Sequence, residues 1–176
     1  MDINLLVKIT SRAWSLTILA LLDAGTPGRQ APLLAASGAS RTAFTQSLQH
    51  LMALNLVERN PGHGHPLRPE FRLTPQGKSV AAIASKITSN PLSSEGSRLL
   101  RRNWSLPILA VSQRPRYFSE IKLDLGTITD RALSQSLQRL HSSRWLTRDI
   151  DPNLRPPRPR YSVANEGKTL SAALNL

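Results

Sequence analysis

The sequence predicts a mainly α-helical protein with small two-stranded β-hairpins, built from two copies of one unit joined head to tail. Three observations predict this fold class. The chain repeats itself after about 90 residues, each copy has apolar residues at helical spacing, and each copy then has two short strand-like runs separated by a Pro- and Arg-rich loop. The sheet is therefore expected to be a minor part of an α+β fold.

The internal repeat is the strongest of these signals. Four blocks recur in the same order at shifts of 89 or 90 residues: 13–20 with 103–110, 46–51 with 135–140, 69–73 with 159–163, and 77–78 with 167–168. Residues 88–97, between the copies, are rich in Ser, Pro and Gly, as in a linker, and Pro91 stops a helix from running through them. We therefore expect one domain at residues 1–91 and a second at residues 92–176.

Each copy is predicted to contain three helices before its strands. They are expected at residues 14–23, 30–36 and 40–53 in the first copy and at 104–113, 117–123 and 129–142 in the second. Ser40 and Thr129 can each accept backbone N–H bonds as the N-cap of the third helix. Along that helix apolar residues recur at i, i+4 and i+7, which gives one face for the core: Phe44, Leu48 and Leu51, and Leu133, Leu137 and Leu140.

Two strands and a closing helix follow in each copy. The strands are expected at 56–59 and 71–73, and at 145–149 and 161–163, with the last helix after Pro75 or Asn165. The segments between the strands, 60–69 and 150–159, contain several Pro and Arg residues and have no apolar face, so they must be exposed loops. Three helices, a strand, a basic loop and a second strand are the element order of a winged helix-turn-helix.

Copy two resembles the HxlR-type bacterial regulators, relatives of the MarR group. Three segments carry the resemblance: YFSEI at 117–121, ITDRALSQ at 128–135 and PPRPRYSV at 156–163. Copy one matches more loosely, because RQAPL at 29–33 lacks the aromatic residue found at Phe118. The resemblance implies DNA-binding regulators that carry one domain per chain and act as homodimers. It also leaves room for a small-molecule effector pocket near Trp14 and Trp104.

Charge points to a polyanionic partner. The chain has 23 Lys and Arg residues, 18 of them Arg, against 11 acidic residues, for a formal net charge of +12. Both copies share the excess: residues 1–90 carry 9 basic and 4 acidic side chains, and residues 91–176 carry 14 and 7. Such an excess, rich in the side chain that best binds phosphate and guanine, favours nucleic acid. With no cysteine and no apolar stretch near 20 residues, we expect a cytoplasmic protein without a cofactor, a metal or a membrane span.

The third helix and the hairpin are the predicted DNA-binding elements, with double-stranded DNA as the partner. On the third helices we expect contacts from Ser40, Arg41, Thr42, Thr45, Gln46 and Gln49, and from Thr129, Arg131, Ser134, Gln135 and Gln138. At the hairpins we expect phosphate or minor-groove contacts from Arg59, Arg68, Arg72, Arg148, Arg155, Arg158 and Arg160. Two such domains in one chain predict a monomeric pseudo-dimer or a homodimer on an imperfect inverted repeat.

Other classes of function fit less well. The rival is a protein-interaction scaffold of tandem winged helices, which needs exposed apolar patches but no basic excess. An RNA binder would need stacking aromatics, and only 5% of the residues are aromatic. His63 and His65 form a poor metal site without nearby carboxylates. No serine has a partnered His and Asp arrangement, so an enzyme is not expected.

Overall fold

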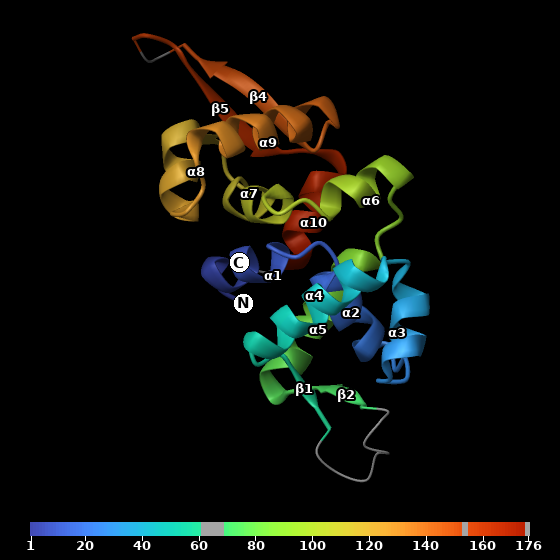
Figure 1. The fold of residues 1–176 in the computed structure, drawn as a ribbon. Helices are drawn as coiled ribbons and strands as arrows, with labels where there is room; N and C mark the ends of the chain where they lie inside the picture. Colours follow the sequence, from blue (N-terminus) through green and yellow to red (C-terminus); the bar gives the residue numbers. More distant parts are fainter. Residues whose placement is uncertain (61–68, 153–154, 175–176) are drawn as a thin grey trace. The chain divides into compact units, whose positions relative to one another are not determined.

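The computed structural model describes residues 1–60, 69–152 and 155–174 (Figure 1). Contacts divide the chain into two compact units, which we call the first unit, Arg12–Pro91, and the second unit, Leu92–Leu176 together with Met1–Ser11. Each unit is mainly helical and has a small antiparallel sheet, which confirms the predicted fold class.

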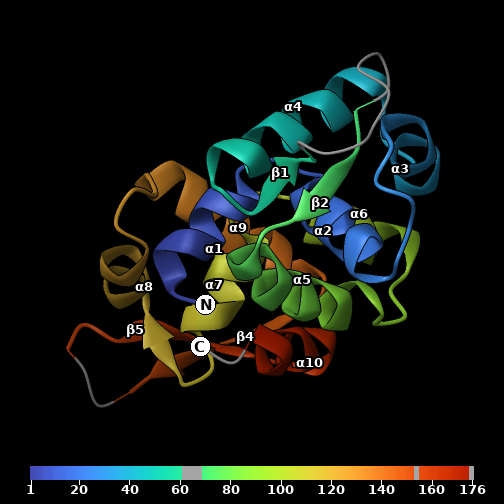
Figure 2. The same cartoon turned by 90° about the horizontal axis from the view of Figure 1, so that it is seen from below.

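The first unit follows the predicted element order. Its elements are α2 (Ser15–Asp23), α3 (Gln30–Ser37), α4 (Arg41–Ala53), β1 (Val57–Arg59), β2 (Phe71–Leu73) and α5 (Pro75–Thr88). Helices α2 and α5 lie side by side (Figure 2) and make the largest contact of this unit. Strands β1 and β2 pair antiparallel with Val57 opposite Leu73. Phe44, Leu48 and Leu51 on α4 are buried, as their spacing predicts.

The second unit repeats this order and adds to it. Its elements are α6 (Ser94–Leu100), α7 (Ser105–Val111), β3 (Arg116–Tyr117), α8 (Phe118–Leu125), α9 (Asp130–Ser142), β4 (Leu146–Asp151), β5 (Arg158–Val163) and α10 (Asn165–Leu174), together with α1 (Ile3–Thr10). The sheet has three strands in the order β3-β5-β4, all antiparallel. Strand β3 was not predicted. In the first unit the corresponding place holds a single bridge between Arg29 and Glu70.

The turn between the two helices of each helix-turn-helix motif ends in a predicted cap. Gly38 and Gly126, which follow α3 and α8, have positive φ angles of +69° and +62°, a conformation that glycine adopts without a Cβ clash. Ser40 Oγ then accepts a hydrogen bond from the backbone N–H of Ala43 at 3.3 Å. Thr129 Oγ1 does the same for Ala132 at 3.2 Å. The predicted N-caps of α4 and α9 are therefore confirmed.

Two helices were missed from the sequence. Helix α6 lies partly within the predicted linker and begins where Ser93 Oγ accepts from the Gly96 N–H at 3.0 Å. Helix α1 is capped by Asp2, which accepts from the Leu5 N–H at 2.8 Å, and its Leu6 and Ile9 are fully buried. Its contacts are with α7 and α8. They group residues 1–11 with residues 92–176, whereas the sequence assigned residues 1–91 to the first domain.

No single helix in the described part of the chain is long and apolar enough to cross a membrane; the consecutive helices α1 and α2 reach that length and composition only when taken together.

Candidate nucleic-acid interface

The solvent face of α4 carries the residues that the sequence singled out. Phe44, Ser47, Leu48 and Leu51 turn inward and are buried. The opposite face is exposed at four of the predicted positions and half-buried at Thr45; the exposed ones are Arg41, Thr42, Gln46 and Gln49. This helix contains no carboxylate. Its exposed face therefore consists of hydrogen-bonding groups without negative charge, as contact with DNA requires.

The solvent face of α9 matches it. Leu133, Leu137 and Leu140 are buried, and the predicted contact residues on the other side are exposed: Arg131, Ser134, Gln135 and Gln138. The helix begins with one carboxylate, Asp130, which forms an ion pair with Lys122 Nζ at 2.6 Å. Ser40 and Thr129 are exposed too, but their hydroxyls accept the capping hydrogen bonds described above. The hydroxyl hydrogen of each capping residue can still donate a hydrogen bond to a phosphate oxygen.

In the first unit the arginines at the hairpin are partly neutralised. Arg72 Nε lies 2.7 Å from Glu58 Oε1, its cross-strand partner, and Arg29 Nε lies 3.0 Å from Glu70 Oε1. Arg59 is exposed at the end of β1. Arg68 lies outside the described residues.

In the second unit the hairpin keeps more uncompensated charge. Arg148, Arg155 and Arg158 are exposed, and none has an ion pair among the described residues. Arg160 differs, because its Nη1 lies 3.4 Å from Asp151 Oδ2, and the Asp151 side chain is only 8% exposed. Three of the four predicted arginines of this hairpin are therefore available to an external anion. The fourth is bound internally.

Tyr117 and Asp151 tie the three strands of this sheet together. The Tyr117 hydroxyl donates to Asp151 Oδ2 at 2.6 Å, and the Tyr117 backbone N–H donates to Glu120 Oε2 at 2.7 Å. The hydrogen bond to Asp151 raises the pKa of Tyr117 above its ordinary value of 10.0, because ionisation would break this bond and place a phenolate beside a carboxylate. Desolvation of the hydroxyl raises the pKa further. Neither residue stands out in the sequence, since it is the pairing of both β3 and β4 with β5 that brings them together.

We predict that Tyr117→Phe lowers the free energy of unfolding at pH 7, because it removes the hydrogen bond from the Tyr117 hydroxyl to the Asp151 carboxylate. A raised folded-state pKa contributes stability that is complete below the ordinary pKa of about 10 and lost as the pH rises through the folded value. The difference in unfolding free energy between the unmodified chain and Tyr117→Phe, measured by urea unfolding, should therefore be smaller above pH 10 than at pH 7. Tyr161→Phe is the control, because no described partner bonds to its hydroxyl. Equal losses in both variants would contradict the assignment.

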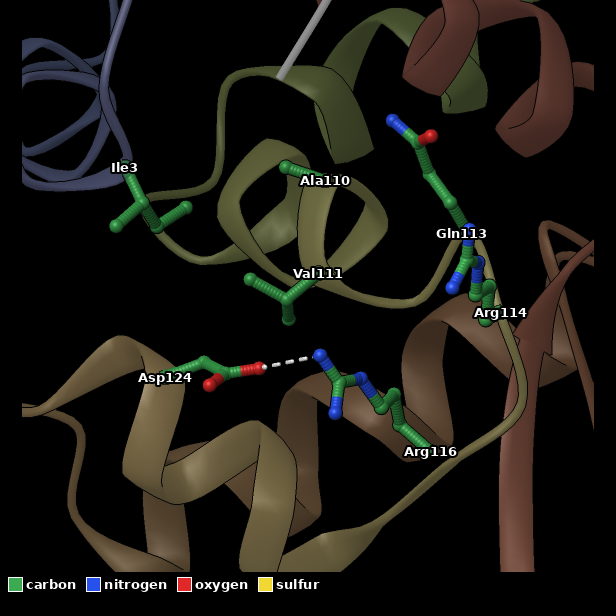
Figure 3. A pocket seen from close by; sticks show the side chains of 7 residues that line it. All are labelled: Ile3, Ala110, Val111, Gln113, Arg114, Arg116 and Asp124. Carbon is green, nitrogen blue, oxygen red and sulfur yellow. Dashed lines mark ion pairs between the residues drawn. The ribbon is translucent and has the colours of Figure 1, made fainter.

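Arg116 links the sheet to the first helix of the helix-turn-helix. Its Nη2 lies 3.3 Å from Asp124 Oδ2 and its Nη1 lies 3.8 Å from Glu120 Oε1, both on α8. Figure 3 shows Arg116 and Asp124 facing each other beside a cavity of about 380 Å³. The other lining residues are Ile3, Ala110, Val111, Gln113 and Arg114. The cavity combines an apolar wall with an exposed guanidinium, Arg114.

Among the described residues, no three His, Asp or Glu side chains lie together in a way that could hold a metal ion. His63 and His65 lie outside them.

Comparisons with known proteins identify the family of this chain. The family model of the HxlR-like helix-turn-helix matches the chain twice, at residues 9–90 and 99–176. A curated relative, an uncharacterized HTH-type transcriptional regulator from Methanothermobacter thermautotrophicus strain Delta H, is 32% identical over 71 residues, or 40% of this chain. The matched part spans about half, 53%, of that relative's length.

Two solved structures are similar to about half of the chain. One is the reduced form of the transcriptional regulator YodB from B. subtilis, with a TM-score of 0.42, 22% identity, and coverage of 48% of this chain and 86% of that one. The other is a MarR-family transcriptional regulator from Porphyromonas gingivalis W83, with a TM-score of 0.42, 19% identity and coverage of 49% and 90%. The two matches of the family model together span nearly the whole chain. The family is one of transcriptional regulators and not of enzymes. The chain therefore belongs to the HxlR-like helix-turn-helix family of DNA-binding transcriptional regulators, and it carries the family's domain twice.

Proposed function

We propose that this chain is a sequence-specific regulator that binds double-stranded DNA as an intramolecular pseudo-dimer, with one winged domain in each half of an imperfect inverted repeat. The observation that carries the proposal is the pair of exposed faces on α4 and α9, polar and free of uncompensated carboxylates, within one polypeptide. Because each unit supplies one such helix, a single chain offers what the family otherwise obtains from two.

The two faces specify what the half-sites share. Gln46 matches Gln135 and Gln49 matches Gln138 in the repeat, and glutamine pairs with adenine in the major groove. The helices differ at their starts, where Arg41-Thr42 stands against Asp130-Arg131. We therefore propose half-sites that agree at the glutamine contacts, differ near the helix starts, and have centres about one turn of DNA, roughly 34 Å, apart.

The hairpins contribute unequally in this proposal. Arg148, Arg155 and Arg158 are the principal phosphate contacts, because the carboxylates of Glu58 and Asp151 already occupy Arg72 and Arg160. We keep Arg59 and Arg68 as contacts of the first hairpin. A small-molecule effector is part of the proposal, and the cavity beside Arg114 and Arg116 is where we place it, since its volume of about 380 Å³ suits a small ligand. We further propose a cytoplasmic location and a domain boundary at residues 91 and 92.

Footprinting of the full chain on the region upstream of its own gene tests the function. We expect protection of an inverted repeat, and loss of contacts at symmetric positions when Gln46→Ala and Gln135→Ala are compared singly. The affinity should fall steeply with salt, with a slope of log K against log salt of about −0.9 per phosphate contacted. Sedimentation of the complex should give one chain per repeat for a pseudo-dimer and two for a homodimer.

The opposite results are equally specific. A protein-interaction scaffold would show no DNA binding at any salt concentration. Loss at neither symmetric position in the two glutamine variants would reject the pseudo-dimer.

A further inference from the structure

Three arginines surround a groove at the C-terminal end of α9. The groove has a volume of about 500 Å³ and lies between α6 and α9, entirely within the second unit. Arg98 and Arg102 line it from α6 and the residues after it, and Arg139 lines it from α9. The remaining lining residues are Glu95, Leu99, Gln138, Ser142 and Ser143.

The charge of this groove is not compensated within the protein. Arg98, Arg102 and Arg139 are all exposed, and none of them has an ion pair or a side-chain hydrogen bond in the described ranges. Glu95 is the one carboxylate of the lining. Like charges held around one groove repel each other, and an anion that bridges the guanidinium groups removes this cost. Guanidinium groups bind phosphate oxygens in paired contacts, so a phosphate group is the chemistry that fits.

The groove continues the proposed DNA-reading face of α9. Gln138 belongs to both, and Ser142 follows it at i+4, on the same side of the helix. A duplex that contacts Arg131 and Gln135 near the start of α9 therefore passes toward the groove at the other end of the helix. This continuity favours a DNA backbone phosphate over a free phosphorylated molecule.

The same charge pattern occurs in the sequence of the other copy. At the positions equivalent to Arg98, Arg102 and Arg139, the first copy has Lys8, Arg12 and His50, so both copies have a basic residue type at each of the three positions. The repeat blocks on either side have the shifts of 90 and 89 that define this equivalence.

We propose that Arg98, Arg102 and Arg139 form a phosphate-binding site of the second unit that holds the DNA backbone beyond the bases read by α9. The inference rests on the proposed function. The site does not follow from the sequence, where α9 and the hairpin carry the predicted contacts of this unit and part of α6 has the composition of a linker.

The test compares the full chain with the triple variant Arg98→Ala, Arg102→Ala, Arg139→Ala on the footprinted duplex over a range of salt concentrations. We expect affinity at low salt to fall by about 10- to 100-fold and the salt slope to become shallower by about 1 to 2, as for one or two lost phosphate contacts. The matched control removes the same charge from the exposed faces of α5 and α10, through Lys78→Ala, Lys86→Ala and Lys168→Ala. Its slope should stay close to that of the unmodified chain. Ethylation of individual phosphates should reveal a flanking position that interferes with binding of the unmodified chain but not of the triple variant.

A second variant distinguishes loss of the site from damage to the fold. Glu95→Gln removes the competing carboxylate and should strengthen binding by about two- to fivefold, an effect opposite in sign to that of damage to the fold. The site is overturned if the triple variant binds DNA with the affinity and salt slope of the unmodified chain, or if it weakens binding no more than the control does. In either case the proposed function stands. Absence of DNA binding by the unmodified chain overturns the proposed function itself.

Discussion

Replacing Arg41 and Arg131 together by alanine should reduce the affinity for the specific duplex by at least about 25-fold. Each arginine is exposed in the first turn of its helix, at the end that a major groove receives. A paired arginine–guanine contact contributes roughly 1–3 kcal/mol of discrimination, or about 5- to 150-fold. The two losses should multiply, because the residues belong to different units and share no partner. Fluorescence anisotropy at fixed salt measures the effect.

This variant separates binding from stability. A cation in the first turn opposes the positive end of the helix dipole, so its removal should leave the melting temperature unchanged or slightly raised. Lys78→Ala with Lys168→Ala is the charge-matched control and should weaken binding by only a few fold, through lost long-range attraction. If the arginine variant keeps its affinity to within about threefold, α4 and α9 do not read this duplex.

Local signals account for the part of the fold that could be predicted from sequence. Ser40 and Thr129 are capping residues at the correct distance before an apolar stripe, and the stripe itself needs no knowledge of its partner. The buried face of each third helix then fixes the opposite face as the exposed one. For this reason the exposed positions on α4 and α9 agree with the structure, apart from the half-buried Thr45.

The missing parts depend on contacts distant in sequence. Strand β3 has two residues, too few for any alternation, and exists because it pairs with β5. Helix α1 presents Leu6 and Ile9 on one side, a pattern that fits either unit equally well. Only the contacts show that α1 packs with α7 and α8 of the second unit. At α6 the Ser and Gly content is typical of a linker, yet Ser93 is a good N-cap and a helix forms.

The charges of the hairpins illustrate the same limit. Sequence cannot tell whether an arginine is free, because its cross-strand neighbour depends on the pairing register. Arg72 stands opposite Glu58 and is paired, whereas Arg148 stands opposite Tyr161 and is not. Arg160 is bound by a carboxylate nine residues away in sequence, Asp151. A count of basic residues therefore overstates the charge that each hairpin can offer to DNA.

Gly77→Ala and Gly167→Ala should each destabilise one unit strongly. Gly77 lies in the first turn of α5, where an added Cβ would overlap the carbonyl oxygen of Leu56; Gly167 has the same relation to the carbonyl of Trp145 in the second unit. Both carbonyls already accept a backbone N–H, from Thr74 at 3.1 Å and from Ala164 at 2.9 Å. Because the obstacle is hydrogen-bonded backbone and not a side chain, it cannot rotate away.

Overpacking of this kind costs about 1–3 kcal/mol or more, which exceeds the gain of about 1 kcal/mol that alanine brings to a helix interior. For units of this size each kcal/mol corresponds to roughly 4–8 °C, so calorimetry should show a midpoint lowered by several degrees or more. Ser79→Ala and Thr169→Ala are matched controls, since both side chains are exposed on the same helices. They should melt at or slightly above the midpoint of the unmodified chain. If the glycine variants also did so, the close approach of Gly77 to the Leu56 carbonyl and of Gly167 to the Trp145 carbonyl would not exist in solution. The first strand of the hairpin and the closing helix of each unit would then lack the contact that holds them together.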